Sequence, residues 1–213
     1  MSRQIKNIFA ITAFLICIGL INIAGQNIDI EIRGMNAFTF ILIVAVLLQI
    51  IFFIPSFLLK TEKYYDLVGS LTYVTTVSLA YFAVENKTMI DSIIYFYVMV
   101  WASRLGIYLF RRVRNDGKDV RFEKAKRHFF WFLQYWMGQA LWVTLTACAA
   151  IIAILSPEDD TLPVLAIFGM ALWLSGFTIE SISDYQKRVF RKENNPSESF
   201  IHTGLWARSR HPN

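Results

Sequence analysis

Acidic and basic side chains recur along one stretch of the sequence, ESISDYQKRVFRKE, which continues a long apolar block. At about 100° per residue, one face of a helix here would carry four charged side chains within an arc of about 60°: Glu180, Asp184, Lys187 and Arg191. This face holds two like-charged pairs at i,i+4, each of which costs a helix roughly a few tenths of a kcal/mol. A helix selected for stability alone would avoid both pairs, so the charged face is interpreted as functional.

A second polar stretch, GLWARSRHPN, carries three basic side chains and an amide: Arg208, Arg210, His211 and Asn213. Arginine offers a planar fork that suits phosphate, and an acid such as Asp184 could accept a hydrogen bond from a ribose hydroxyl or an amide. The two stretches together predict a site for a phosphorylated cofactor. Neither a GxGxxG nor a GxxxxGK[ST] motif occurs, so a nucleotide would bind without a Rossmann or P-loop frame. With three histidines and no Cys/His cluster, a metal site is not predicted.

The rest of the chain is built to lie in a membrane. Its 213 residues are 55% hydrophobic and only 17% charged, below the roughly 25% charged residues of soluble domains. A membrane-spanning helix needs about 20 apolar residues, and six segments qualify or come close: 8–24, 36–59, 66–84, 90–110, 129–155 and 162–182. These blocks are too long for barrel strands, so they predict an all-α polytopic transmembrane helix bundle.

Charge distribution predicts the orientation of this bundle. The net charge is +5, and the excess of Lys and Arg lies at the N-terminus, in residues 111–128 and after residue 186, which the positive-inside rule assigns to the cytoplasm. The outer loops carry mostly acidic residues instead. The N-terminus is therefore expected to be cytoplasmic, and the basic excess gives no support for a nucleic-acid partner. The chain is expected to form a single membrane domain, with a six-helix bundle at 8–182 and a cytoplasmic cofactor segment at 183–213.

Two polar side chains fall inside the apolar blocks. Arg104 either snorkels to the membrane interface or is paired within the bundle. Gln139 is expected to form hydrogen bonds between helices.

Six stretches resemble one known family. The run Asp184-Tyr-Gln-Lys-Arg-Val-Phe, followed by Thr203-Gly-Leu-Trp-Ala-Arg-Ser-Arg-His-Pro-Asn, is similar to a membrane family of unknown function grouped with the steroid 5-alpha-reductases. The family also matches four stretches upstream: Thr61-Glu-Lys-Tyr-Tyr-Asp-Leu-Val-Gly-Ser, Trp101-Ala-Ser-Arg-Leu-Gly-Ile-Tyr-Leu-Phe-Arg, Gly117-Lys-Asp-Val-Arg-Phe and Gln139-Ala-Leu-Trp. The resemblance covers about residues 55–213.

This resemblance implies a membrane-embedded reductase that delivers hydride from NADPH to an activated C=C bond of a sterol or other lipid. It implies that Asp184, Arg191 and Asn213 contact the cofactor. Arg208, Arg210 and His211 match the surrounding motif and would line the same pocket. The steroid reductases carry Asn where Glu180 stands, and Trp101 occupies the position of their substrate-polarising Tyr, so the catalytic donor is not identified. Membrane lipids and a hydrophobic, lipid-like substrate are the implied partners.

Two other classes remain open. Isoprenylcysteine carboxyl methyltransferases and bacterial phospholipid methyltransferases also carry Arg-His-Pro after a Gly-aromatic pair and use S-adenosylmethionine, although the DYQKR and GKDVR stretches favour the reductases. A non-enzymatic membrane protein or fragment is the third class. Family members run on past His-Pro-Asn into Tyr-Phe-Gly-Glu and further helices, so the resemblance leads us to expect a truncated chain without reductase activity of its own. A bacterial plasma membrane is favoured over the endoplasmic reticulum, because no retention signal is visible.

Overall fold

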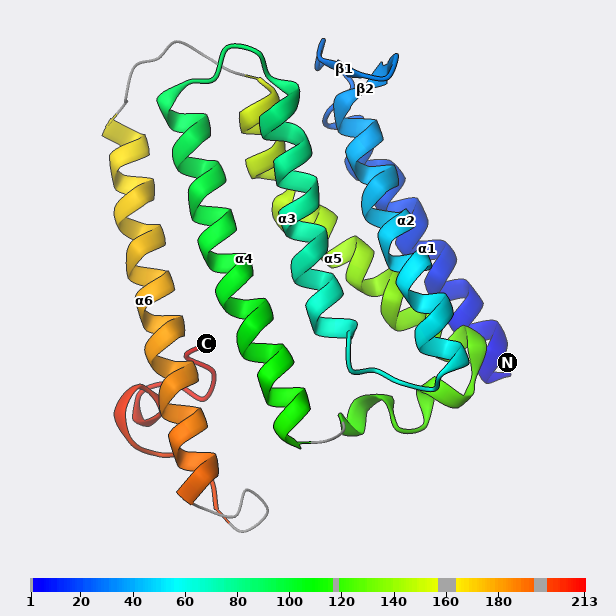
Figure 1. The fold of residues 1–213 in the computed structure, drawn as a ribbon, viewed down its shortest axis with the longest axis vertical. Coiled ribbons are helices and arrows are strands. Elements are labelled where there is room, and N and C mark those ends of the chain that lie inside the picture. Colours follow the sequence, from blue (N-terminus) through cyan, green and yellow to red (C-terminus); the bar gives the residue numbers. More distant parts are fainter. Residues whose placement is uncertain (1, 117–118, 157–163, 194–198) are drawn as a thin grey trace. The chain divides into compact units, whose positions relative to one another are not determined.

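Long helices dominate the computed structural model, which describes residues 2–116, 119–156, 164–193 and 199–213 (Figure 1). Within these residues the long helices are α1 (Arg3–Ile23), α2 (Ala37–Leu58), α3 (Tyr65–Ala83), α4 (Met89–Asp116), α5 (Phe129–Leu155) and α6 (Val164–Glu193). The short elements are β1 (Glu31–Ile32), β2 (Met35–Asn36), η1 (Val120–Phe122), η2 (Ala125–Arg127) and η3 (Gly204–Ala207). Each predicted span has become a helix, so the all-α bundle is confirmed.

Five of these helices are long and apolar enough to cross a membrane: α1, α2, α4, α5 and α6. The chain is therefore an integral, multi-pass membrane protein. The cytoplasmic position of the N-terminus stays a prediction.

Helix α3 differs from the prediction that about six segments are apolar enough to span. It contains several hydroxyl-bearing residues, and the helices α2, α4 and α5 pack around it. Thr72 Oγ1 donates to the Val68 carbonyl at 2.7 Å, and Thr76 Oγ1 donates to the Thr72 carbonyl at 2.8 Å. A helix packed against other helices can form hydrogen bonds with its polar side chains in this way. It can therefore contain fewer apolar residues than a helix that faces lipid.

Capping side chains set the starts of α2 and α4, which lie on the same side of the bundle (Figure 1). Asn36 Oδ1 accepts from the Thr39 backbone N–H at 3.0 Å and so caps α2. Its Nδ2 donates to the carbonyls of Gly25 and Ile28, which ties the loop after α1 to the same point. At the start of α4, Asp91 Oδ2 accepts from the Thr88 backbone N–H, and Thr88 Oγ1 accepts from the Asp91 N–H. This reciprocal pair satisfies two N–H groups that the first turn of a helix leaves without partners.

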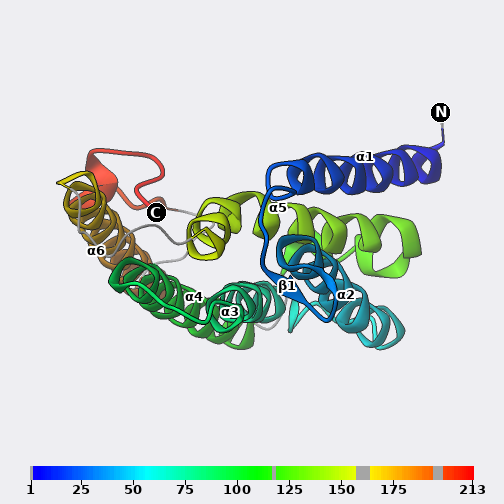
Figure 2. The same ribbon diagram turned by 90° about the horizontal axis from the view of Figure 1, so that it is seen from above.

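The chain divides into two compact units, Met1–Asp160 and Thr161–Asn213. In the first unit, α5 lies between α1 and α2, and α3 runs beside α4 (Figure 2). Small residues allow this close packing: a Cβ at Gly69 would lie 2.6 Å from Gln139 Nε2, and one at Gly106 would lie 2.6 Å from Ser70 Cβ. The second unit contains α6 and the C-terminal segment, which hold the two polar stretches of the sequence.

Candidate functional site

The two polar stretches meet in the second unit. Asn213 Nδ2 donates a hydrogen bond of 2.7 Å to Asp184 Oδ1, across 29 residues of sequence. Ser183 and Asp184 are buried, with the Asp184 residue only 4% exposed, although most of α6 is accessible. The C-terminal segment therefore folds back on one turn of α6 and covers it.

Three further contacts hold the segment on this turn. Trp206 Nε1 donates to the Ser183 carbonyl at 3.1 Å, and the Leu205 backbone N–H donates to Gln186 Oε1 at 3.0 Å. Lys187 Nζ lies 4.8 Å from the centre of the Trp206 ring, a cation–π distance. The segment is thus fixed by hydrogen bonds to both backbone and side chain of α6.

The fold-back depends on a glycine. Gly204 begins η3 with a φ of +62°, a left-handed conformation that side chains rarely adopt. A Cβ at Gly204 would also clash with the side chain of Gln186, whose Nε2 would lie too close to it.

We expect Gly204→Ala to displace the C-terminal segment, with a local cost of about 1–3 kcal/mol. Limited proteolysis should then cut the variant after residue 198 faster than the wild type, while Gly176→Ala, which has open space around it, should leave the rate unchanged.

The basic residues of the predicted site are accessible to solvent. Arg208, Arg210 and His211 on the segment are exposed, as is Arg191 on α6. The backbone N–H of His211 donates to Ser209 Oγ at 3.2 Å. The structure therefore brings Asp184 and Asn213 into direct contact and leaves the four basic residues exposed to solvent.

A second charged cluster, in the first unit, was not singled out by sequence reasoning. Glu62, just before α3, is 4% exposed, and its carboxylate contacts Lys126 Nζ at 2.6 Å and accepts from the Asp119 backbone N–H at 3.1 Å. Asp66, on the first turn of α3, contacts Arg112 at 3.2 Å and Arg121 at 3.9 Å. We refer to these six side chains as the loop network: Glu62, Asp66, Arg112, Asp119, Arg121 and Lys126.

The loop network docks the connection between α4 and α5 onto α3. Burial on its own would raise the pKa of Asp119, but its hydrogen bonds to Arg121 and the positive charge there outweigh burial and lower the pKa below its usual value. The same hydrogen bond raises the pKa of Arg121. Beside them, Phe122 is buried against Tyr65 and Tyr135, with ring centres 4.8 and 4.9 Å apart. Two of the stretches that carried the family resemblance, around Glu62 and Asp119, are thus adjacent in space, and a single sequence gives no sign of that pairing.

The other polar positions have separate surroundings. Trp101 packs edge-on against Tyr73, with ring centres 5.0 Å apart, and Arg104 is partly buried on α4. Gln139 Oε1 is buried and accepts no hydrogen bond from the residues that the structure describes, which differs from the interhelical bonding expected of it. No group of three His, Cys, Asp or Glu side chains that could hold a metal ion occurs among the described residues.

Comparison with known proteins agrees with the family resemblance. No curated protein and no solved structure matches the chain. Residues 52–213 match a family described as proteins of unknown function, DUF1295. The matched region includes the loop network, Asp184 and the C-terminal segment, and it covers well over half of the chain. The chain therefore belongs to the DUF1295 family.

Proposed function

We propose that this protein is a membrane-embedded reductase that uses NADPH to reduce an activated C=C bond of a sterol or other lipid. The observation that carries the proposal is the 2.7 Å hydrogen bond between Asn213 and Asp184. It joins the two stretches that the resemblance to the steroid 5-alpha-reductases assigns to one cofactor, and Trp206 and Gln186 hold the second stretch in place.

Each side chain at this site can form hydrogen bonds or ion pairs with one part of NADPH. The guanidinium groups of Arg191, Arg208 and Arg210 can bind phosphate oxygens through paired N–H groups. The Asp184 carboxylate can accept from a ribose hydroxyl or from the nicotinamide amide, and the Asn213 amide can both donate and accept. The acid therefore sets the position of an uncharged part of the cofactor, and the arginines set the position of its anionic part.

The reaction would proceed in the apolar surroundings that a multi-pass membrane protein provides. When bound, NADPH supplies a hydride from the nicotinamide ring to the β carbon of the conjugated C=C bond. A hydrogen-bond donor of the protein would stabilise the negative charge on the conjugated carbonyl oxygen, and a proton taken up from solvent would complete the reduction at the α carbon. That donor is not assigned, because Trp101 lacks the phenol of the reductase residue to which it corresponds. A bacterial plasma membrane is the proposed location.

Binding of the cofactor tests this proposal directly. Trp206 lies on the segment that would contact NADPH, so titration of the detergent-purified protein with NADPH is expected to quench tryptophan fluorescence saturably. Trp206→Phe keeps an aromatic ring at this position and should remove most of the quenching. Calorimetry with S-adenosylmethionine should show no heat of binding. Saturable binding of S-adenosylmethionine without binding of NADPH would replace the proposal with the methyltransferase alternative, and binding of neither would overturn both enzyme proposals.

A further inference from the structure

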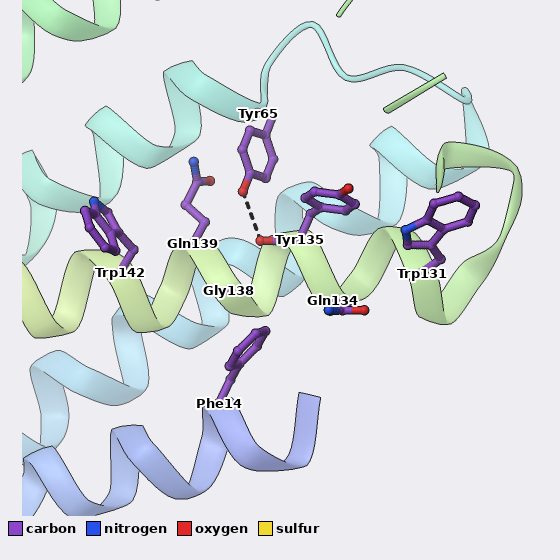
Figure 3. A pocket seen from close by; sticks show the side chains of 8 residues that line it. All are labelled: Phe14, Tyr65, Trp131, Gln134, Tyr135, Gly138, Gln139 and Trp142. Carbon is purple, nitrogen blue, oxygen red and sulfur yellow. Dashed lines mark hydrogen bonds between the residues drawn. The ribbon is translucent and has the colours of Figure 1, made fainter. Parts of the chain in front are cut away.

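A groove runs along α5 in the first unit, away from the residues of the proposed cofactor site in sequence. Its volume is about 380 Å³, within the range of roughly 300–1,000 Å³ that is usual for sites of small molecules. The floor is one face of α5, where Trp131, Tyr135, Gly138 and Trp142 follow one another at intervals of three or four residues (Figure 3). The floor therefore extends over the twelve residues from Trp131 to Trp142, or about 16 Å along the helix.

Aromatic side chains from two other helices form the walls of this groove. Phe14 of α1 lies on one side of α5 and Tyr65 of α3 on the other (Figure 3). Tyr65 Oη donates to the Tyr135 carbonyl at 3.0 Å, which holds this ring in place. A Cβ at Gly138 would lie 3.3 Å from Phe14 Cε2, so the glycine keeps the floor open where the Phe14 wall is closest.

Among the described residues that line the groove, one buried side-chain oxygen has no hydrogen-bond partner. Gln139 lines the groove, and its Oε1 is buried without a hydrogen bond in the described part of the chain. Helix α5 is long and apolar enough to cross a membrane, and Gln139 lies ten positions after its start, about 15 Å along a helix of 27 residues, so a crossing places it within the hydrocarbon core. Water is scarce at this depth, and a carbonyl oxygen without a donor is costly there. The terminal torsion of a glutamine is broad, so the amide of this lining residue can rotate to meet a donor in the groove.

We propose that this groove binds a neutral lipid alcohol, whose hydroxyl donates to Gln139 Oε1 and whose apolar body lies along the aromatic floor. The residues that line the groove carry no charge. One charge lies near its Trp131 end, where the Arg3 guanidinium is 4.6 Å from the centre of the Trp131 ring, so the part of the groove around Gln139 and Gly138 does not select a charged head group. Because Gln139 Oε1 can only accept a hydrogen bond, it favours a ligand with a hydroxyl that donates one. Because the groove lies in a membrane protein, the rest of the ligand is expected to be apolar. The site is independent of the proposed reductase function, because no residue of the C-terminal segment takes part in it.

Binding measurements with matched ligands test the proposal. The full chain, purified in detergent, would be assayed with tritiated cholestanol and with tritiated hexadecanol, each compared with its methyl ether. The ether has the same apolar body but cannot donate a hydrogen bond. We expect at least one alcohol to bind about 10-fold more tightly than its ether, the effect of one hydrogen bond in an apolar site.

Two glutamine variants locate the effect. Gln139→Leu should bind alcohol and ether alike, and its melting temperature should be no lower than that of the wild type, because a buried acceptor without a partner is removed. Gln49→Leu is the control: within the described residues Gln49 Oε1 is also buried without a partner, although its Nε2 donates to Thr72 Oγ1, and it lies outside the groove. This variant should keep the preference for the alcohol. Gly138→Leu fills the floor and should weaken both ligands. Equal binding of alcohol and ether by the wild type, absence of binding of both alcohols, or a preference that survives in Gln139→Leu would each overturn the proposal.

Discussion

Replacing Asp184 with alanine is expected to weaken NADPH binding by about 10- to 100-fold, the range that loss of a hydrogen bond to a charged group produces. Two effects add in this variant. The carboxylate that would accept from the cofactor is lost, and the Asn213 amide loses the acceptor that holds it on α6. The measurement is the dissociation constant of NADPH from tryptophan quenching, compared with the wild type in the same detergent.

Two further variants make the Asp184 result interpretable. Glu193→Ala removes an acid from the last residue of α6, which is exposed, and should leave NADPH affinity unchanged. Asn213→Ala should weaken binding as well, and the double variant should lose less than the sum of the single losses, because the two side chains act through one hydrogen bond. Additive losses, or an unchanged affinity in Asp184→Ala, would separate Asp184 from the cofactor site.

The largest effect on stability is expected at Glu62. Glu62→Ala leaves Lys126 without its partner where that lysine side chain is only 21% exposed, and removal of one member of a buried ion pair costs about 3–5 kcal/mol. The Asp119 backbone N–H loses its acceptor in the same variant. The free energy of unfolding in denaturant, measured in detergent micelles, should fall by this amount.

The matched variants distinguish loss of the ion pair from general damage. The double variant Glu62→Leu with Lys126→Leu should be more stable than Glu62→Ala, because no buried charge is left without a partner. Lys124→Ala removes a neighbouring exposed lysine of the same loop and should change the unfolding free energy by less than about 0.5 kcal/mol. A Glu62→Ala variant as stable as the wild type would show that the loop network does not hold the loop on α3.

Most of the helices could be predicted from the sequence, because a bilayer leaves few alternatives for long apolar blocks. The bounds of α5 were predicted to the residue, 129–155, since His128 and the residues after Leu155 end the apolar block sharply. Helix α3 shows the limit of hydropathy: its hydroxyl-bearing residues lower its apolar character, and only the packing of three helices around it explains them. Hydropathy also misses the last part of α6, which continues to Glu193, well beyond the apolar block that ends at residue 182. That part is polar, and only its helical periodicity indicates that the helix continues.

The candidate site was only partly readable in the sequence. The spacing of Asp184 and Arg191 on one helix face follows from helical periodicity, but the contact between Asp184 and Asn213 depends on the fold-back at Gly204. The roles of Gln186 and Trp206 in that fold-back were missed, because a glutamine and a tryptophan near a membrane interface usually have no such partner. The pairing of Glu62 with Lys126 spans 64 residues, and no local pattern encodes a contact at that separation.

Hydrogen–deuterium exchange of the purified protein with and without NADPH tests the central claim most directly, because it reports where the cofactor binds. Bound NADPH should slow exchange in peptides that cover residues 180–193 and 204–213, with no comparable change in residues 1–160. The same protection should be absent in Asp184→Ala at equal NADPH concentration. Unchanged exchange in both peptides at saturating NADPH would contradict the account, as would protection there by S-adenosylmethionine in place of NADPH.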